Sequence, residues 1–404
     1  MNDFGILPTR RRTMSGRSLD EHRAATPLEL FFDLAFVVAI AFAAKVLHHD
    51  IVEHHYVDGV IHFVTAFFAI WWAWMNYTWF ASAYDTDDVP FRLLTMVQMM
   101  GVVVMAVGIN EGGGFGGAQV VGYVIMRLAL VAQWLRASRE DSAHRATCRR
   151  YAVGIMVVQA YWIAAVLVVT ESGVLVAFAV GVLLELSVPR IAERTGMTPW
   201  HPHHIAERYG LLVIIVLGEG VLGMTNALAA SIDELGWTTS LLIVAPASIA
   251  LLLGMWWAYF LAPYGDRLAA QPQHCWRWGY GHVFMFAPLA ALGAGLEVAE
   301  TAIAHPEDVT PLVAALAIVI PITIFLVAKY LIHNLLWHRE GWYDRIMLLA
   351  LAMLAAVVAL GLADVPVEYV IAASVLVPVV LIAPTEWRYR GSAGDDTANA
   401  AVSA

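Results

Sequence analysis

The clearest sign of architecture in this chain is the stretch TPLVAALAIVIPITIFLVAKYLIHNLLW, which covers residues 310–337. Lys329 is its only formally charged residue, and most other positions carry apolar side chains. About 20 apolar residues suffice for a helix to cross a hydrocarbon core of roughly 30 Å. The stretch therefore predicts a membrane-spanning helix, and similar stretches recur along almost the whole chain.

The composition is that of a membrane protein rather than a soluble one. Of the 404 residues, 60% are hydrophobic and only 14% are charged, whereas roughly a quarter of a soluble domain is charged. We predict an all-α, polytopic membrane fold with about twelve transmembrane helices. The expected spans are 29–48, 57–83, 91–110, 118–136, 151–170, 173–188, 207–230, 238–262, 277–300, 310–337, 343–363 and 366–386.

The loops between these spans differ in charge, which predicts the orientation of the chain. Alternate loops carry arginine, whereas the charged residues of the loops between them are only acids and histidines. Since basic residues collect on the cytoplasmic side, we expect an inner-membrane protein with cytoplasmic N- and C-termini. The arginines expected inside are Arg10, Arg11, Arg12, Arg17, Arg23, Arg92, those from Arg136 to Arg150, Arg190, Arg194, Arg267, Arg339, Arg345, Arg388 and Arg390.

Several functions find no support in the sequence. The net charge of −10 comes largely from acidic loops and a short acidic tail, and no feature indicates nucleic-acid binding. Cys148 and Cys275 fall in expected cytoplasmic loops, so neither a disulfide nor a cysteine zinc site is predicted. The chain has no P-loop, Gly-x-Ser-x-Gly, His-Glu-x-x-His or dinucleotide motif, which argues against ATP-driven pumping and hydrolase chemistry. No cofactor is predicted, and the expected partners are the lipid bilayer and a small-molecule or ion substrate.

Landmarks that recur in the same order predict a duplication into two parallel six-helix repeats. An alternative is that aromatic and basic residues recur because membrane interfaces favour them. In the duplicated arrangement the parts are a basic cytoplasmic segment (1–28), the first repeat (29–188), a cytoplasmic linker (189–206), the second repeat (207–386) and a disordered cytoplasmic tail (387–404). The matched landmarks are Glu29 with Glu207, Trp71–Trp74 with Trp256–Tyr259, Gly108–Asn110 with Gly295–Glu297, and Arg127 with Lys329.

Four charged residues inside the expected spans are the main candidates for substrate binding or proton coupling. Glu219 lies about 18 Å into its span, and Arg127 and Lys329 lie about 14 and 12 Å from the inner boundary. Asp33 lies one turn beyond the start of the first span. Charges at such depths are costly, so a functional role is the default interpretation. We expect the four to converge on one polar centre; the alternative is a set of ion pairs that locks the bundle.

Secondary candidates lie nearer the ends of the spans. Glu29 completes the capping box Thr26-Pro27-Leu28-Glu29, which favours a structural role. Glu297 and Asn110 occupy equivalent repeat positions and are predicted to form an outer exit gate. The candidates at the inner end are Glu185, Glu207, Arg208 and His282, any of which could also lie at the membrane interface.

Histidines raise two further alternatives, and no metal or catalytic residue is assigned from either. His282 and His333 lie at similar depth, which leaves a bis-histidine haem as an alternative. A cluster in the first outward loop could capture a divalent ion, but its spacing fits no established ligand pattern, so a solvated loop is preferred. That cluster is His48, His49, Asp50, Glu53, His54 and His55.

The segment Pro27-Leu28-Glu29-Leu30-Phe31-Phe32-Asp33-Leu34-Ala35-Phe36-Val37 resembles the bacterial low-temperature-requirement protein A (LtrA) family. The resemblance covers nearly the whole chain and implies a bacterial multi-pass membrane protein whose family name records a growth phenotype in the cold. It implies no established substrate or reaction, so it assigns no catalytic residue. Further matching segments are Trp71–Trp74, Asp85–Asp88, His204–Arg208, Leu217–Glu219 and Gly281–His282.

The function predicted first is a secondary transporter or permease for a small solute, with an anion as one candidate. In this hypothesis Arg127 and Lys329 attract the anionic group, while Glu219 or Asp33 exchanges a proton. The segment Tyr84–Pro90 lacks the loop motif of the major facilitator family, so a different transporter fold is expected. The alternatives are an intramembrane enzyme or redox protein that acts on lipid or quinone, and a membrane-adaptation sensor, channel or scaffold.

Overall fold

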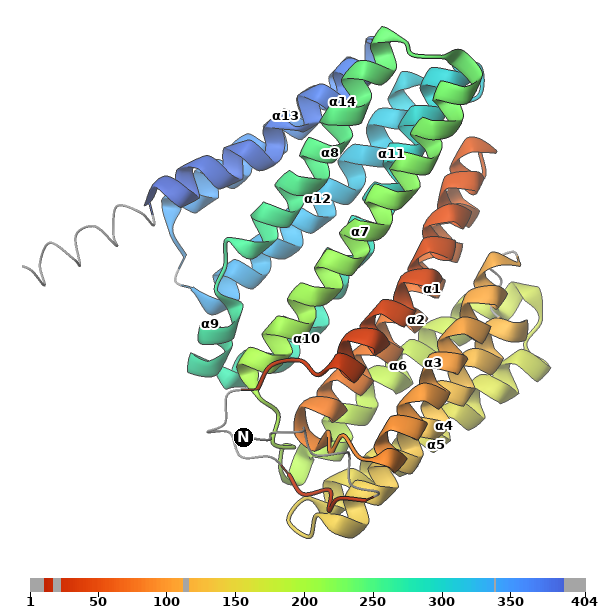
Figure 1. The fold of residues 1–404 in the computed structure, drawn as a ribbon, viewed down its shortest axis with the longest axis vertical. Helices are drawn as coiled ribbons and strands as arrows, with labels where there is room; N and C mark the ends of the chain where they lie inside the picture. The colour runs from red at the N-terminus through yellow and green to blue at the C-terminus, as the bar shows by residue number, and fades with distance from the viewer. Residues whose placement is uncertain (1–10, 17–22, 112–115, 338, 389–404) are drawn as a thin grey trace, which may run out of the picture. The chain divides into compact units, whose positions relative to one another are not determined.

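The computed structural model describes residues 11–16, 23–111, 116–337 and 339–388 (Figure 1). All regular structure in these ranges is helical, which confirms the all-α prediction. The expectations for Arg10, Arg17, Arg390 and the tail from residue 389 onward lie outside the described residues.

Twelve helical segments within the described ranges are long and apolar enough to cross a membrane. The count agrees with the prediction, and the chain is an integral membrane protein. Two of the segments, Thr239–Ala270 and Pro272–Ala304, each contain two α-helices, so the twelve segments comprise fourteen α-helices. The helices are α1 (Pro27–Val52), α2 (Tyr56–Tyr84), α3 (Val89–Asn110), α4 (Gly117–Glu140), α5 (Arg145–Val168), α6 (Val174–Ala192), α7 (Pro202–Leu235), α8 (Thr239–Phe260), α9 (Tyr264–Ala270), α10 (Cys275–Gly281), α11 (Val283–Ala304), α12 (Pro311–Leu336), α13 (Gly341–Leu362) and α14 (Val367–Ser374). After Val375, residues 376–388 continue the last span as a helix, and three short 3₁₀ helices cover Glu171–Gly173, Glu193–Thr195 and Pro272–His274.

Helix α7 is longer than the expected span 207–230. It begins at Pro202, a residue suited to a first helical turn because its missing N–H has no partner there. It ends before Gly236, whose φ of 70° is the left-handed conformation that terminates many helices. Helix α6 also continues to Ala192, through Pro189 in its last turn. The non-helical connection is therefore shorter than the expected linker 189–206.

The expected span 277–300 is two helices rather than one. Helix α10 ends at Gly281 and α11 begins at Val283, so His282 marks the break. The Nδ1 atom of His282 donates to the backbone carbonyl of Trp278 at 2.7 Å, a carbonyl that a continuous helix would bond through a backbone N–H. The side chain thus satisfies the helix end that the break exposes.

The chain divides into two compact units. Unit 1 comprises residues 1–46 and 57–211, and unit 2 comprises residues 47–56 and 212–404. In unit 1, α4 packs against α3 and α5, and α5 packs against α6. Gly108 and Gly122 bring α3 and α4 into backbone contact, because a Cβ on either would lie 2.1–2.3 Å from a backbone nitrogen of the other helix. Small residues at helix contacts are typical of membrane proteins.

Unit 2 is built around α12, which packs against α11, α13 and α14, while α8 packs against α14 and α11. The side chain of Thr310 caps the start of α12 by accepting from the Val313 N–H at 3.3 Å, and Pro311 follows it in the first turn. Gly295 lies against the Ala317 carbonyl, where a Cβ would approach to 2.2 Å. The sequence that first indicated a membrane helix is thus the central helix of this unit.

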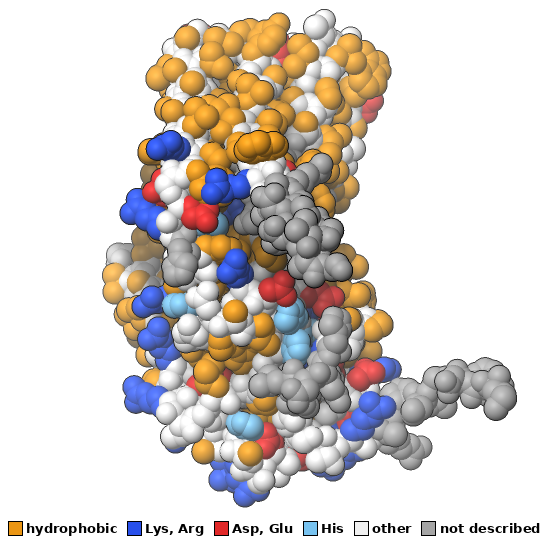
Figure 2. All heavy atoms as spheres, turned by 90° about the vertical axis from the view of Figure 1, so that its left-hand side faces the viewer, with side chains coloured by type: hydrophobic (Ala, Val, Ile, Leu, Met, Phe, Trp, Pro, Cys, Tyr) orange, Lys and Arg blue, Asp and Glu red, His pale blue; other side chains and the backbone are white. Residues whose placement is uncertain are grey.

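Apolar side chains on the outer surface are consistent with a lipid environment. Helix α3 is the clearest case, because exposed residues recur every three or four positions while Thr95 and Gln98 are buried. A helix with lipid on one face and protein on the other exposes apolar residues and buries polar ones, which is the reverse of the pattern in soluble proteins. Figure 2 shows broad hydrophobic areas on the visible face, with Lys and Arg side chains gathered apart from the most continuous of them. The exposed stripe of α3 is Leu93, Met96, Met100, Val103 and Val107.

The N-terminal segment 11–16 is attached to the start of α3 and the end of α4 through Asp88. This carboxylate caps α3 by accepting from the Phe91 N–H at 3.1 Å, and it also accepts from the Arg12 N–H at 2.7 Å. Arg136 donates to it from Nη2 at 2.6 Å. Burial alone would raise the pKa of Asp88, but these hydrogen bonds outweigh burial and lower the pKa to about 2.

Each unit contains one cysteine, and both are buried and outside any disulfide. Cys148 in α5 has no exposed surface and lies 3.5 Å from the Tyr84 hydroxyl, while Cys275 in α10 is 1% exposed. The thiols are therefore shielded by packing rather than by a disulfide.

Candidate functional site

Glu29 forms the capping box predicted from the sequence. The Thr26 N–H donates to Oε2 of Glu29 at 2.8 Å, and the Glu29 N–H donates to the Thr26 hydroxyl at 3.3 Å. Glu29 also makes ion pairs with Arg23 at 2.7 Å and with Arg208 at 3.1 Å. All three charged side chains are buried, so Glu29 joins the cap of α1 to a charge network.

Asp33 lies one turn further along α1 and is held by two other helices. Arg208 of α7 donates from Nε to Oδ2 of Asp33 at 2.8 Å, and Trp74 of α2 donates from Nε1 to Oδ1 at 2.7 Å. Asp33 and Arg208 have no exposed surface. Asp33 therefore lies in a buried ion pair between helices, as in the alternative of bundle-locking ion pairs raised from the sequence.

These residues belong to a larger set in unit 1 that we call the Arg208 cluster. Arg23 also binds Asp85 at 3.0 Å and donates to the backbone carbonyls of Ala81 and Ser82. His204 lies 3.3 Å from Glu29. Each acid therefore lies next to an arginine, and such pairing is what allows ions to be buried in a low-dielectric interior. The cluster consists of Arg23, Glu29, Asp33, Asp85, His204 and Arg208.

A second network in unit 1, the Glu185 cluster, forms around the carboxylate of Glu185 in α6. Arg127 of α4 donates from Nη2 to Oε2 at 2.8 Å, and Tyr123, one turn earlier, donates to Oε1 at 2.6 Å. Helices α2 and α5 supply the remaining donors, so the carboxylate ties four helices together. These donors are Trp72 at 2.8 Å, Gln159 at 3.3 Å and Trp162 at 3.2 Å.

Unit 2 brings Glu219 of α7 close to Glu297 of α11, and we call these two the carboxylate pair. A Cβ on Gly223, one turn after Glu219, would lie 2.1 Å from Oε1 of Glu297. In return, a Cβ on Gly293, one turn before Glu297, would lie 3.8 Å from Oε2 of Glu219. Between them the helices touch, because the same Cβ on Gly293 would lie 2.9 Å from the Cα of Gly220. The Glu297 carboxylate thus lies against Gly223, one turn from Glu219, and the Glu219 carboxylate lies near Gly293, one turn from Glu297.

No counter-charge accompanies the carboxylate pair among the described residues. Glu219 is 6% exposed and its Oε2 atom has no hydrogen-bond partner. Glu300, one turn beyond Glu297 on α11, is fully buried and neither of its carboxylate oxygens has a partner. Glu300 was not among the residues predicted from the sequence. The spacing Glu297-x-x-Glu300 could have found it, since residues three apart share one face of a helix.

Lys329 lies on α12 in unit 2 and lines a pocket. The residue is 4% exposed, and no described carboxylate pairs with it. His333, one turn later, lines the same pocket, together with Trp337, Trp342 and Tyr343. Lys329 therefore makes no ion pair with Glu219, although both belong to unit 2. We call this site the Lys329 pocket.

The remaining candidates lie in less informative positions. Glu207 is exposed and accepts from the Ala25 N–H at 3.3 Å, while Asn110 is an exposed residue at the end of α3. His282 is buried at the break between α10 and α11. Glu297 belongs to the carboxylate pair, and its role in an exit gate with Asn110 stays a prediction, as does the convergence of Arg127 with Glu219.

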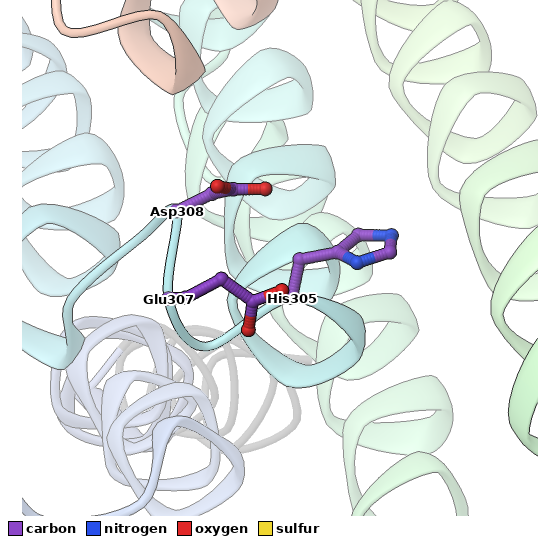
Figure 3. Close-up of side chains that lie close together, drawn as sticks. All are labelled: His305, Glu307 and Asp308. Carbon is purple, nitrogen blue, oxygen red and sulfur yellow. The ribbon is translucent and has the colours of Figure 1, made fainter.

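Among the described residues, the side chains that lie close enough together to hold a metal ion are outside the histidine cluster at residues 48–55. His305, Glu307 and Asp308, in the connection between α11 and α12, bring one ligand atom each to within 4.8 Å of one another (Figure 3). Both acids are exposed, and His305 also lies 3.4 Å from Glu234. Exposed acids of a turn often lie this close without an ion, so we assign no metal to this group.

Comparisons with known proteins agree with the resemblance seen in the sequence. The family described as bacterial low temperature requirement A protein (LtrA) has a model that matches residues 24–383. An uncharacterized protein of Rhizobium meliloti (strain 1021) is 30% identical over 251 residues, which are 60% of this chain and 59% of that protein. The chain thus spans less than two thirds of the length of this relative. No solved structure gives a significant match.

Proposed function

Because this chain belongs to the bacterial LtrA family and is an integral membrane protein, we propose that it is a secondary transporter of a small solute, coupled to protons. The family supplies the membrane context but no substrate. The proposal therefore rests on the buried charges of the chain itself, and on the carboxylate pair above all.

The observation that carries the proposal is the approach of Glu219 and Glu297 without a counter-charge. Two neighbouring carboxylates repel one another when both are ionised, so one of them retains a proton or the two share a cation. An isolated ion inside a membrane span is costly, by about 3 kcal/mol on insertion scales. If the carboxylate pair gained or lost access to water, the number of protons bound to it would therefore change. Proton coupling requires this property.

The two clusters of unit 1 serve a different purpose in this proposal. Each acid of the Arg208 and Glu185 clusters makes an ion pair with an arginine, and breaking such buried pairs is costly. Asp33 and Arg127 therefore hold helices in position rather than carry protons or substrate. Glu29, Glu185 and Arg208 share this structural role.

We further propose that residues 29–188 and 207–386 are parallel six-helix repeats joined by a cytoplasmic linker, with both termini cytoplasmic. Packing within the units supports this arrangement, because corresponding neighbours pack together in both. The third to sixth spans pack in sequence as α3, α4, α5 and α6, and the ninth to twelfth pack in sequence as α11, α12, α13 and α14. Arg127 and Lys329 lie on corresponding helices α4 and α12.

Solute-driven proton movement tests the function directly. The purified protein is reconstituted into liposomes that contain a pH-sensitive dye, and small organic acids and inorganic ions are added one at a time outside. We expect at least one solute to change the internal pH through the wild-type protein. The variants Glu219→Gln and Glu297→Gln remove the titratable groups with little change in size, so we expect them to remain folded and to lose the response.

The control is Glu111→Gln, which neutralises an exposed acid at the end of α3 and should retain the response. The proposal would be wrong if none of the solutes changed the internal pH through the folded wild-type protein. It would also be wrong if the response persisted in both carboxylate variants. Turnover of labelled lipid, or a Soret band from bound haem, would instead favour the enzyme or redox alternative.

A further inference from the structure

The Lys329 pocket contains a buried cation that the fold does not neutralise. Lys329 is 4% exposed and no described acid pairs with it. On the corresponding helix α4, by contrast, Arg127 makes a 2.8 Å ion pair with Glu185. An unpaired lysine inside a membrane helix costs up to about 2.5–3.5 kcal/mol on insertion scales, the full cost applying at the helix centre. Lys329 therefore needs a counter-charge that the described residues do not supply.

The charged side chains near the pocket do not supply this counter-charge. Asp344 of α13 is already bound by Arg339 at 3.0 Å and by the Tyr330 hydroxyl at 2.6 Å. Glu340 accepts from the indole N–H of Trp342. Arg267 lies 4.8 Å from the ring of Trp337 and adds a second positive charge. The pocket is therefore electropositive, and its nearest acids are engaged elsewhere.

The walls of the pocket supply flat apolar surfaces and a second polar atom. The ring of His333 is stacked on Trp337, with centroids 4.9 Å apart and planes within 5°, and it lies 4.1 Å from the ring of Tyr343. The Nε2 atom of His333 has no hydrogen-bond partner among the described residues. Since His333 follows Lys329 by one turn of α12, both polar groups project from the same face of the helix.

We propose that this pocket binds an oxyanion, a carboxylate or phosphate group, with the Lys329 ammonium as its counter-charge and His333 Nε2 as a second polar contact. The pocket has a volume of about 20 Å³, which has room for the oxyanion only, so an apolar body attached to it would lie outside this volume. The inference names the substrate class of the transporter proposed above and rests on that function only for its biological meaning. Binding itself is measured without transport.

Aromatic anion binding in a neutral membrane is the direct test. The protein is placed in nanodiscs of phosphatidylcholine and titrated with benzoate, cyclohexanecarboxylate, inorganic phosphate and, as an uncharged analogue, benzamide. Trp337 and Trp342 line the pocket, so tryptophan fluorescence and thermal stability report occupancy. We expect saturable binding of benzoate that the uncharged benzamide does not reproduce.

Variants of Lys329 separate charge from packing. Lys329→Met keeps a long apolar side chain and should weaken benzoate binding about tenfold or more, because a charge-assisted hydrogen bond is lost. Lys329→Arg keeps the charge and should retain most of the affinity. Arg345→Met removes an exposed charge that does not line the pocket, and we expect its affinity to equal that of the wild type.

Lipid is the other source of an oxyanion, and a second set of nanodiscs tests it. If phosphatidylglycerol occupies the pocket, its inclusion should weaken benzoate binding in the wild type but not in Lys329→Met. Absence of saturable anion binding in neutral lipid, or equal affinity in wild type and in folded Lys329→Met, would overturn the inference. Anion binding without any solute-driven proton movement would retain the site and remove the transport function.

Discussion

The two units bury charged side chains in opposite ways. In unit 1, Asp33 and Glu185 each accept hydrogen bonds from an arginine and from at least one indole N–H. In unit 2, Glu219, Glu300 and Lys329 are buried with no ion-pair partner among the described residues. Both units are bundles of apolar helices, so hydrophobic burial alone does not explain the difference.

The contrast separates structural from functional polarity. A charge-paired network, in which each acid contacts an arginine, fixes the positions of helices. An unsatisfied one is stabilised by whatever neutralises it, whether a proton at the carboxylate pair or an oxyanion at the Lys329 pocket. We therefore expect mutations in unit 1 to affect stability first, and those at the polar sites of unit 2 to affect ligand and proton binding first.

The largest effect on stability is expected from Arg208→Met. The change leaves Asp33 and Glu29 buried without their shared guanidinium, so we expect a loss of about 3–5 kcal/mol in the free energy of unfolding. Unfolding in detergent by added denaturing surfactant, followed by circular dichroism, gives the measurement. The matched control is Glu207→Gln, which alters the exposed neighbouring residue and should remain within about 0.5 kcal/mol of wild type. Equal stability of Arg208→Met and wild type would mean that the Arg208 cluster is not a structural network.

A smaller effect is expected at the glycine contact of unit 2. In Gly293→Ala the new Cβ would lie 2.9 Å from the Cα of Gly220, so α7 and α11 must separate. We expect a loss of about 1–3 kcal/mol, as for other overpacked sites. A Cβ on Gly218 would meet no described atom within 4 Å, so Gly218→Ala should be neutral, or stabilising by up to about 1 kcal/mol through helix propensity. If both variants have the same stability, the α7–α11 contact is not as close as described.

The smallest effect is a dependence on acid at the attachment of the N-terminal segment in unit 1. Because the folded state lowers the pKa of Asp88 to about 2, its ionised form stabilises the fold above the unfolded pKa of about 3.9. That contribution is lost progressively as the pH falls from about 4 towards 2. Asp88→Asn keeps a capping side chain but has no such titration. The stability difference between wild type and Asp88→Asn should therefore shrink across this range, and a constant difference would contradict the assignment.

The spans were predictable from the sequence, because a long apolar stretch is a local property that the bilayer selects directly. The partners of the charged residues were not. Asp33 and Arg208 are 175 residues apart in the chain, and nothing local to either residue names the other. The break at His282 also escaped prediction, since it depends on a side chain that replaces one backbone hydrogen bond.

The candidate site was predictable in its residue types but not in its grouping. Glu219 and Lys329 were found because a charge within an apolar span is conspicuous in any window of sequence. Glu297 was predicted to form an outer gate with Asn110 because the two occupy equivalent positions of the expected repeats. Its neighbour Glu219 becomes apparent only when the glycines of α7 and α11 are seen in contact. The predicted repeat pairs Arg127 with Lys329, but it could not show that Arg127 has a counter-ion and Lys329 has none.

The shielded cysteines of the two units have a practical consequence. Cys148 and Cys275 have almost no exposed surface, so in the folded protein maleimide reagents should react with them slowly compared with a cysteine introduced at the surface. Dyes or spin labels could then be attached at chosen surface positions without first removing the native thiols. One label on each unit would allow resonance energy transfer to follow their separation while solute and pH are varied.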